Sequence, residues 1–399
     1  MNHFRVACLS LLIIASAMGC STGNRGSKGA LLEQTDVFVA GQDGVAQYRI
    51  PVLVTSNKGT LLAFCDARVK RSGDPPNDID LVMKRSTDGG RTWGPLKTLV
   101  DNGEEAIADS CGLVDRQTGT IWVFSVYAPV GVGSSNAAVG LTGATFFYKA
   151  IKSDDDGETW SQPIDITPMV KKPEWSAGST GVGKGIQMRN GRLVVPRYHA
   201  DYHRPGSTGT EETTYSSSYV SYSDDHGQTW KMGADAESQG TTNECQVAEM
   251  ADGSLLLNMR GTRGNNRKTA RSRDGGITWT DAVEDLQLIE PRCQGSLESY
   301  TNAIDHDKNR LLFANPASLK RQNMTVRLSY DDGRTWPVAK QIHAGPAAYS
   351  CLTVLADMTA ACLYERGDKS AYEKITYARF NVEWLTGGKD AIAKKQPSQ

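Results

Sequence analysis

The sequence predicts an all-β protein built as a six-bladed β-propeller, and two internal repeats carry this prediction. An octapeptide with the pattern S-x-D-x-G-x-T-W occurs five times, starting at Ser86, Ser153, Ser223, Ser272 and Ser329. A turn residue followed by a short apolar strand occurs six times, starting at residues 59, 119, 191, 253, 309 and 358. Short-strand repeats of about 50 to 70 residues are typical of propeller blades. A tandem array or solenoid is the alternative architecture.

The octapeptide has the chemistry of a tight turn with an apolar anchor. Its Asp and Ser side chains hydrogen-bond nearby backbone amides, and its Gly supplies a positive φ. Its Trp offers a large face to bury. Because one active site needs one constellation of residues, five copies indicate a structural role. We therefore assign to turns the aspartates Asp88, Asp155, Asp225, Asp274 and Asp331.

Composition and the N-terminal sequence indicate where in the cell the protein is expected. The chain has 399 residues, 40 glycines and a net charge of −1, so no general field attracts nucleic acid or a membrane surface. Residues 1–5 carry a basic side chain, residues 6–18 are apolar but too short to span a bilayer, and small residues precede Cys20. This pattern predicts export with a lipid anchor at Cys20, as an outer-membrane lipoprotein. A plain secretory signal, giving a periplasmic or secreted protein, is the alternative.

These observations define four expected segments. We expect a lipoprotein-type signal peptide over 1–19, a tether over 20–34, the propeller over 35–386 and a flexible tail over 387–399. Six cysteines remain after the signal and Cys20, and they could pair in 15 ways. Several lie in apolar strand-like runs, so buried free thiols are an equal expectation. None has C-x-x-C spacing, and we expect no metal and no cofactor.

The first repeat unit opens with Tyr48-Arg49-Ile50-Pro51. An aromatic-R-I-P box followed by five S-x-D-x-G-x-T-W boxes resembles the bacterial exo-α-sialidases, or neuraminidases, over residues 35–386. The resemblance implies a six-bladed sialidase-like propeller that removes terminal sialic acid from mucins, glycoproteins, gangliosides or oligosaccharides. It implies no nucleic-acid partner and no cofactor.

The resemblance also implies a set of substrate-binding residues. Three arginines would hold the sialic acid carboxylate, and they match Arg49, Arg260 and Arg321, with Arg327 an alternative for the third. A guanidinium binds a carboxylate bidentately and stays charged at any working pH. Further matches are Arg68 beside the substrate carboxylate, Asp109 on the glycerol or N-acyl side, and Glu365 bracing Arg49.

The catalytic residues follow from the charge of the substrate. The anomeric carbon of sialic acid bears a carboxylate, which disfavours a carboxylate nucleophile, and sialidases use Tyr instead. Tyr349 matches that nucleophile, and Glu244 matches the base that a phenol with a pKa near 10 needs, with Glu249 as the fallback.

The general acid and base matches Asp74, on a loop rich in Gly and Pro, where desolvation would raise its pKa; Asp78 and Asp80 compete for this role. The expected reaction is hydrolysis with retention through a covalent sialyl-tyrosine. A trans-sialidase or intramolecular trans-sialidase on the same scaffold is the first alternative. An inactive sialoglycan-binding protein is the second.

Overall fold

The computed structural model describes residue 1 and residues 29–394 of the chain. The expected signal peptide, Cys20 and the tether as far as residue 28 therefore lie outside the described residues, as do residues 395–399. Among the residues described, no helix is long and apolar enough to cross a membrane.

In the described part of the chain, 24 of the 25 strands form six antiparallel blades, as the repeats predict. Blade 1 contains β2 (Gln47–Thr55), β3 (Leu61–Arg68), β4 (Ile79–Ser86) and β5 (Lys97–Val100). Blade 2 contains β6 (Ala106–Val114), β7 (Ile121–Ala128), β8 (Phe147–Ser153) and β9 (Ile164–Asp165). Blade 3 contains β10 (Ala177–Thr180), β12 (Ile186–Gln187), β13 (Leu193–Asp201), β14 (Tyr215–Ser223) and β15 (Lys231–Met232).

The second half of the chain repeats the plan. Blade 4 contains β16 (Thr242–Glu249), β17 (Leu255–Gly261), β18 (Asn266–Ser272) and β19 (Val283–Ile289). Blade 5 contains β20 (Ser296–Thr301), β21 (Arg310–Pro316), β22 (Gln322–Ser329) and the first part of β23 (Val338–Val354). Blade 6 contains the second part of β23, β24 (Ala360–Arg366), β25 (Lys374–Phe380) and β1 (Leu32–Val39).

Three further short elements complete the described part of the chain. The helices are α1 (Thr167–Val170) and α2 (Val382–Thr386), and β11 (Gly183–Lys184) pairs in parallel with β6.

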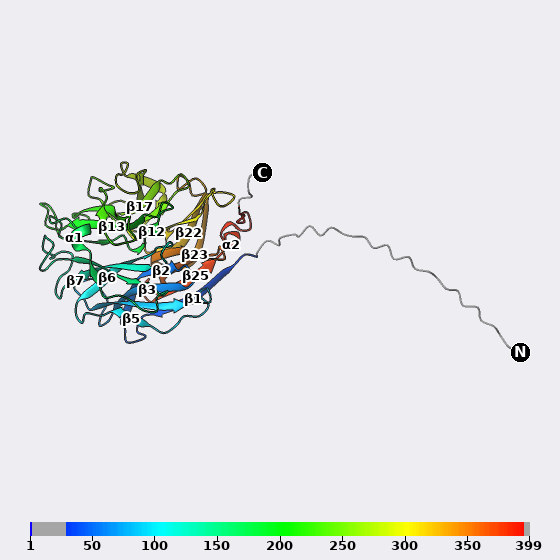
Figure 1. The fold of residues 1–399 in the computed structure, drawn as a ribbon, viewed down its shortest axis with the longest axis horizontal. Coiled ribbons are helices and arrows are strands. Elements are labelled where there is room, and N and C mark those ends of the chain that lie inside the picture. Colours follow the sequence, from blue (N-terminus) through cyan, green and yellow to red (C-terminus); the bar gives the residue numbers. More distant parts are fainter. Residues whose placement is uncertain (2–28, 395–399) are drawn as a thin grey trace.

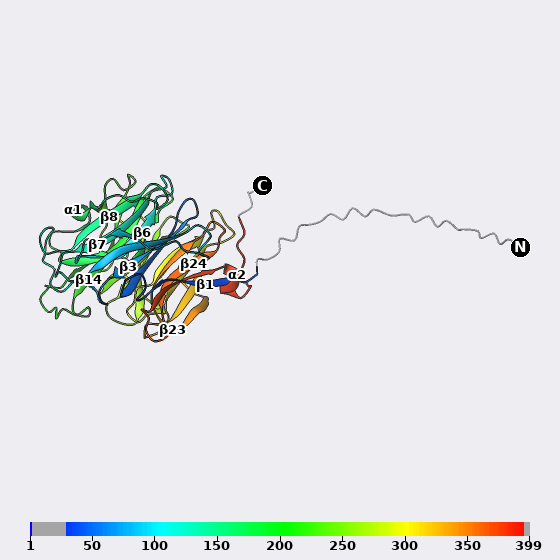
Figure 2. The ribbon, with the colours of Figure 1, turned by 90° about the horizontal axis from the view of Figure 1, so that it is seen from below.

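The N-terminal strand closes the ring. β1 pairs antiparallel with β25 from Leu32 to Val39, so the first described strand is the outermost strand of the last blade. Figure 1 shows the dark blue β1 running beside the red β25, and Figure 2 shows β1 with β24 and α2. The propeller thus begins at Leu32, three residues before the expected boundary. Pairing the two ends of the chain leaves no gap between the first and last blades.

The octapeptides link the third and fourth strands of blades 1 to 5. In each, the Ser hydroxyl bonds the Asp, the Asp accepts from the Thr amide and hydroxyl, and the Gly amide donates to the Ser. Hydrogen bonds lower the pKa of Asp88 and Asp155, and for Asp274 they outweigh burial and bring the pKa to about 2. These carboxylates therefore serve to hold the turns together.

The octapeptide glycines set the spacing between blades. Their φ values lie between 80° and 92°. A Cβ on Gly90 of blade 1 would lie 2.2 Å from the Tyr377 ring of blade 6, and a Cβ on Gly157 of blade 2 would lie 2.2 Å from Leu62 of blade 1. Since only Gly allows both the conformation and this approach, each copy fixes one blade against the preceding one.

The C-terminal segment differs from the expected flexible tail. Asp390 is buried and accepts hydrogen bonds from Arg310 Nε and Nη2, both at 2.7 Å. Arg310 is itself buried and needs counter-charges, so residues 387–394 pack against blade 5. All six described cysteines are buried free thiols rather than disulfides.

Candidate active site

A cavity of about 360 Å³ lies on the propeller axis, because all six blades contribute residues to its wall. Eight residues expected at the site line it together: Arg49, Arg68, Asp74, Asp109, Glu244, Arg260, Arg321 and Tyr349. The ninth, Glu365, is fully buried behind Arg49. The alternatives lie elsewhere. Glu249 lines a cavity with a different set of wall residues, Arg327 bonds Asn315, Asp78 pairs with Lys70, and Asp80 is absent from the wall.

Tyr349, Glu244 and Arg260 form one hydrogen-bonded group on the floor of the cavity. The Tyr349 hydroxyl donates to Glu244 Oε1 and accepts from Arg260 Nη1 at 3.1 Å. Arg260 Nη1 also donates to Glu244 Oε2 at 2.7 Å. Burial, and then the Glu244 carboxylate, raise the pKa of Tyr349 well above its ordinary value. The phenol is therefore neutral at pH 7, with an acceptor for its proton already in contact.

Glu365 connects Arg49 to Tyr349. Its Oε1 accepts from Arg49 Nε at 2.6 Å and from the Ile50 amide at 2.9 Å, and its Oε2 accepts from the Tyr349 amide at 3.0 Å. The Arg49 guanidinium lies 5.0 Å from the centre of the Tyr349 ring. One buried carboxylate thus fixes both Arg49 and the backbone of Tyr349. Arg49, Arg260 and Arg321, the three arginines expected to bind the substrate carboxylate, are together called the clamp.

Arg321 is held by neutral acceptors. Its Nη1 donates to the Tyr372 hydroxyl at 2.9 Å and its Nη2 to the Arg292 carbonyl at 3.1 Å. Tyr372 also lies under Arg49, 4.3 Å from its guanidinium. Tyr372 therefore bridges two of the expected clamp arginines, and no repeat or motif in the sequence marks it.

Bulges in the innermost strands orient several side chains of the candidate site. The pairing register shifts at four places: Arg49/Val52 in β2, Ala108/Cys111 in β6, Thr242/Cys245 in β16 and Ala347/Ser350 in β23. These intervals contain or border Arg49, Asp109, Glu244 and Tyr349. Ile50 and Asp109 have φ values of 62° and 54°, which costs about 1–3 kcal/mol each. Bulges of this kind redirect side chains next to active sites.

Asp74 sits at the mouth of the cavity. Its side chain is 79% exposed and pairs with Arg68. Although the side chain reaches solvent, the surrounding protein partly desolvates it and raises its pKa, but Arg68, Arg49 and Arg321 together outweigh that effect, and the net pKa is below its ordinary value. This is the opposite of the expected direction, because the guanidinium groups favour the carboxylate more strongly than desolvation disfavours it.

Two further aspartates lie deeper. Burial, and then the carboxylates of Glu244 and Asp74, raise the pKa of Asp109 to about 7. Asp66 is fully buried in the wall, and burial raises its pKa well above its ordinary value. Among the residues described, no group of His, Cys, Asp and Glu is arranged to hold a metal ion.

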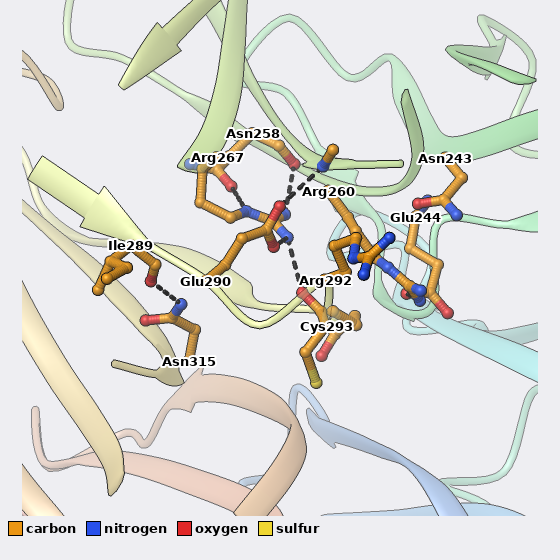
Figure 3. Close-up of polar contacts among 12 residues, drawn as sticks. Asn243, Glu244, Asn258, Arg260, Arg267, Ile289, Glu290, Arg292, Cys293 and Asn315 are labelled. Carbon is orange, nitrogen blue, oxygen red and sulfur yellow. Dashed lines mark hydrogen bonds and ion pairs between the residues drawn. The ribbon is translucent and has the colours of Figure 1, made fainter. Parts of the chain in front are cut away.

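A buried ion pair supports the arginines from behind. Arg267 Nη1 bonds Glu290 at 2.7 Å and the Cys293 carbonyl at 2.9 Å, and Glu290 accepts from the Gly261 amide at 2.8 Å. Figure 3 shows this pair beside Arg260, with Arg292 and Cys293 close by. Gly261 follows Arg260, and the Arg292 carbonyl holds Arg321. The pair therefore links the backbone supports of two clamp arginines.

The fold and the site define a six-bladed propeller with an arginine-lined axial pocket and a paired Tyr and Glu. The sequence model of the family described as "BNR repeat-like domain" matches residues 59–362. A solved structure described as Hadza microbial sialidase Hz136 superposes with a TM-score of 0.79 at 36% identity, covering 88% of this chain and 69% of that one. The chain belongs to the sialidase family of BNR-repeat proteins.

Two other similar proteins are a curated relative and a solved structure. A sialidase from Bacteroides fragilis is 38% identical over 347 residues, which is 82% of this chain, and the chain spans 61% of that relative's length. An intramolecular trans-sialidase from Ruminococcus gnavus, in complex with oseltamivir carboxylate, superposes with a TM-score of 0.76 at 23% identity, covering 91% of this chain and 99% of that chain. At that identity, the likeness concerns the fold alone.

Proposed function

We propose that the protein is a retaining exo-α-sialidase that hydrolyses terminal sialic acid through a covalent intermediate on Tyr349. The observation that carries the proposal is the contact of the Tyr349 hydroxyl with both Glu244 and Arg260, on a floor flanked by Arg49 and Arg321. The sialidase relatives support the same activity. The cavity volume falls within the ~300–1,000 Å³ range of small-molecule sites.

In the first step, the substrate carboxylate binds Arg49, Arg260 and Arg321, which places the anomeric carbon above Tyr349. The Tyr349 oxygen forms a bond to that carbon while its proton passes to Glu244. The glycosidic carbon–oxygen bond breaks, and Asp74 gives its proton to the departing oxygen. The arginines hold the like-charged carboxylate away from the attacking oxygen and stabilise the charge that moves in the transition state.

In the second step, water attacks the anomeric carbon and Asp74, now ionised, takes the proton of that water. The bond to Tyr349 breaks, and the phenolate recovers its proton from Glu244. Two displacements at one carbon leave the configuration unchanged, so the product is the retained anomer.

Asp74 must carry a proton at the start, although its pKa is lowered by Arg68, Arg49 and Arg321. A bound substrate carboxylate offsets the charges of Arg49 and Arg321, and the sugar covers an exposed side chain. Both effects raise the pKa of Asp74 toward the range of a general acid. The acid therefore becomes competent when the substrate is in place.

The test is Tyr349→Phe, assayed with an aryl sialoside. We expect kcat to fall by roughly a thousandfold or more while the variant folds normally, because only the phenol oxygen is lost. Tyr300→Phe is the matched control, since Tyr300 is buried and donates to the Met358 carbonyl outside the pocket. Near-wild-type turnover by Tyr349→Phe would refute the assignment of the nucleophile.

Product analysis separates hydrolysis from transfer. A hydrolase releases free sialic acid, a trans-sialidase passes it to an added acceptor sugar, and an intramolecular trans-sialidase yields an anhydro product. We expect free sialic acid from mucin-type, glycoprotein, ganglioside or oligosaccharide substrates. Binding without turnover would instead indicate a sialoglycan-binding protein.

We also propose that the protein is exported and anchored by a lipid on Cys20, as an outer-membrane lipoprotein. The basic residue, short apolar stretch and small residues before Cys20 support this location. Cys20→Ala should move the protein from the membrane pellet to the soluble fraction. An unchanged distribution between the two fractions would contradict the lipid anchor.

A further inference from the structure

The loop over residues 202–214, between β13 and β14, reaches across to blades 4 and 5 on the rim of the pocket. Arg263 Nε donates to the Glu212 carbonyl at 2.9 Å, and the Glu212 carboxylate pairs with Arg292. On its other side, His203 Nε2 lies 2.8 Å from the Ala137 carbonyl. These contacts place the loop next to the arginines of the clamp.

Glu211 is the residue of this loop that enters the clamp. Arg260 Nη2 donates to its carboxylate at 2.7 Å, and Asn243 Nδ2 donates to it at 2.6 Å. Figure 3 shows Asn243, Glu244 and Arg260 close together. Asn243 and Arg260 are the two residues that donate to Glu211. The Glu211 side chain is 35% exposed, so it is held by these two donors rather than by packing.

Arg260 has more anionic partners than the other two arginines of the clamp. Its guanidinium pairs with two carboxylates, Glu244 and Glu211, each at 2.7 Å. Within the described residues, Arg49 pairs with the Glu365 carboxylate alone, and Arg321 donates to a hydroxyl and a carbonyl. Glu244 is needed as the proton acceptor of Tyr349, whereas Glu211 forms no hydrogen bond with the Tyr349 hydroxyl. A substrate carboxylate arriving at Arg260 would be the third anion on one cation, which is electrostatically unfavourable.

We infer that Glu211 sets the affinity of the pocket for anionic sugars by competing with the substrate carboxylate for Arg260. The inference rests on the proposed function. Glu211 also lines a second cavity of about 410 Å³, which shares Arg260 and Arg321 with the first and extends over Pro291 and Arg292. The carboxylate therefore has room to withdraw when the substrate binds. Each binding event breaks the Glu211–Arg260 pair, and this cost weakens the apparent affinity.

The test compares Glu211→Gln with wild type, with 2-deoxy-2,3-didehydro-N-acetylneuraminic acid and its methyl ester as probes in titration calorimetry. The amide that replaces the carboxylate carries no charge and offers Arg260 a weaker partner. We expect the acid to bind roughly five- to tenfold tighter to the variant, because a partly exposed charge-assisted pair contributes about that much. The methyl ester, which lacks the carboxylate, should bind both proteins equally. KM for an aryl sialoside should fall in the variant more than kcat changes.

Glu212→Gln is the matched control, since it removes the same charge from the same loop without touching Arg260. It should leave the affinity for the acid unchanged. Weaker or equal binding of the acid by Glu211→Gln would overturn the inference and make Glu211 a positioning residue for Arg260. Equal tightening by both variants would assign the effect to loop anchoring and also overturn it. A wild-type protein that binds neither probe would instead refute the proposed function.

Discussion

Glu365→Gln tests how far one buried carboxylate organises the site. Glu365 accepts three hydrogen bonds, from Arg49 Nε, the Ile50 amide and the Tyr349 amide, and its side chain is fully buried. The amide oxygen of Gln can keep the two bonds to Oε1, but its NH2 group then faces the Tyr349 amide, which is also a donor. Arg49 is left without its counter-ion.

Removing one partner of a buried ion pair costs about 3–5 kcal/mol. At about 2 °C per kcal/mol for a chain of this size, the melting temperature should fall by roughly 6–10 °C. The folded variant should also lose activity, because both Arg49 and the backbone of Tyr349 lose their shared support. We would measure the melting temperature by calorimetry, and kcat and KM on an aryl sialoside well below it.

Glu298→Gln is the control for this change. Glu298 pairs with Lys184, both side chains are 14% exposed, and both line a separate cavity rather than the candidate active site. This variant should lose stability but keep its kcat/KM. Wild-type kcat/KM in folded Glu365→Gln would refute the organising role of Glu365, as would an equal loss of kcat/KM in both variants.

Three other predictions follow from single contacts. Asp74→Asn should slow substrates with poor leaving groups far more than activated aryl sialosides, measured as kcat/KM for both; equal losses would remove Asp74 as the general acid. Asp109→Asn keeps the positive φ, which Asn tolerates. Burial, and then the carboxylates of Glu244 and Asp74, raise the pKa of Asp109 to about 7 in the folded protein, against about 4 in the unfolded chain. The contribution of Asp109 to stability is therefore full below pH 4 and is lost as the pH rises through 7. The difference in unfolding free energy between wild type and Asp109→Asn should therefore decline from pH 5 to pH 7, and a constant difference in denaturant titrations would contradict this. Asp225→Ala removes three turn hydrogen bonds and should cost about 1 kcal/mol of stability without changing kcat/KM; lost activity in the folded variant would argue against a purely structural turn.

The architecture was largely predictable because its markers are local. A turn that needs positive φ and close approach to the preceding blade requires Gly, and a buried or half-buried Trp beside it completes a pattern that repeats in blades 1 to 5. The closing strand was not predictable in this way. β1 carries neither marker, and its place is set by pairing with β25 more than 330 residues later. The packing of Asp390 on Arg310 is likewise a long-range contact.

The site was predictable only where its residues resemble family motifs. Arg49, Glu244, Arg260 and Tyr349 stand in strands with recognisable flanks, so the resemblance pointed to them as candidates, and the structure brings them to one cavity. Glu211 lies on a long loop and contacts residues 32 and 49 positions away. Polar loop residues of this kind have no periodicity, and their partners are decided by the tertiary fold. The strand bulges that aim the side chains are equally invisible without the pairing register.

Trapping of the covalent intermediate tests the central claim most directly. A sialosyl fluoride with fluorine at C3 forms the glycosyl-enzyme bond but hydrolyses slowly, because the fluorine disfavours the positive charge of the second transition state. Mass spectrometry of the peptic digest should show one added fluorosialosyl group on the peptide that contains Tyr349, and Tyr349→Phe should show none. A digest without the adduct, or with the group on Glu244 or Asp74, would contradict the proposed mechanism.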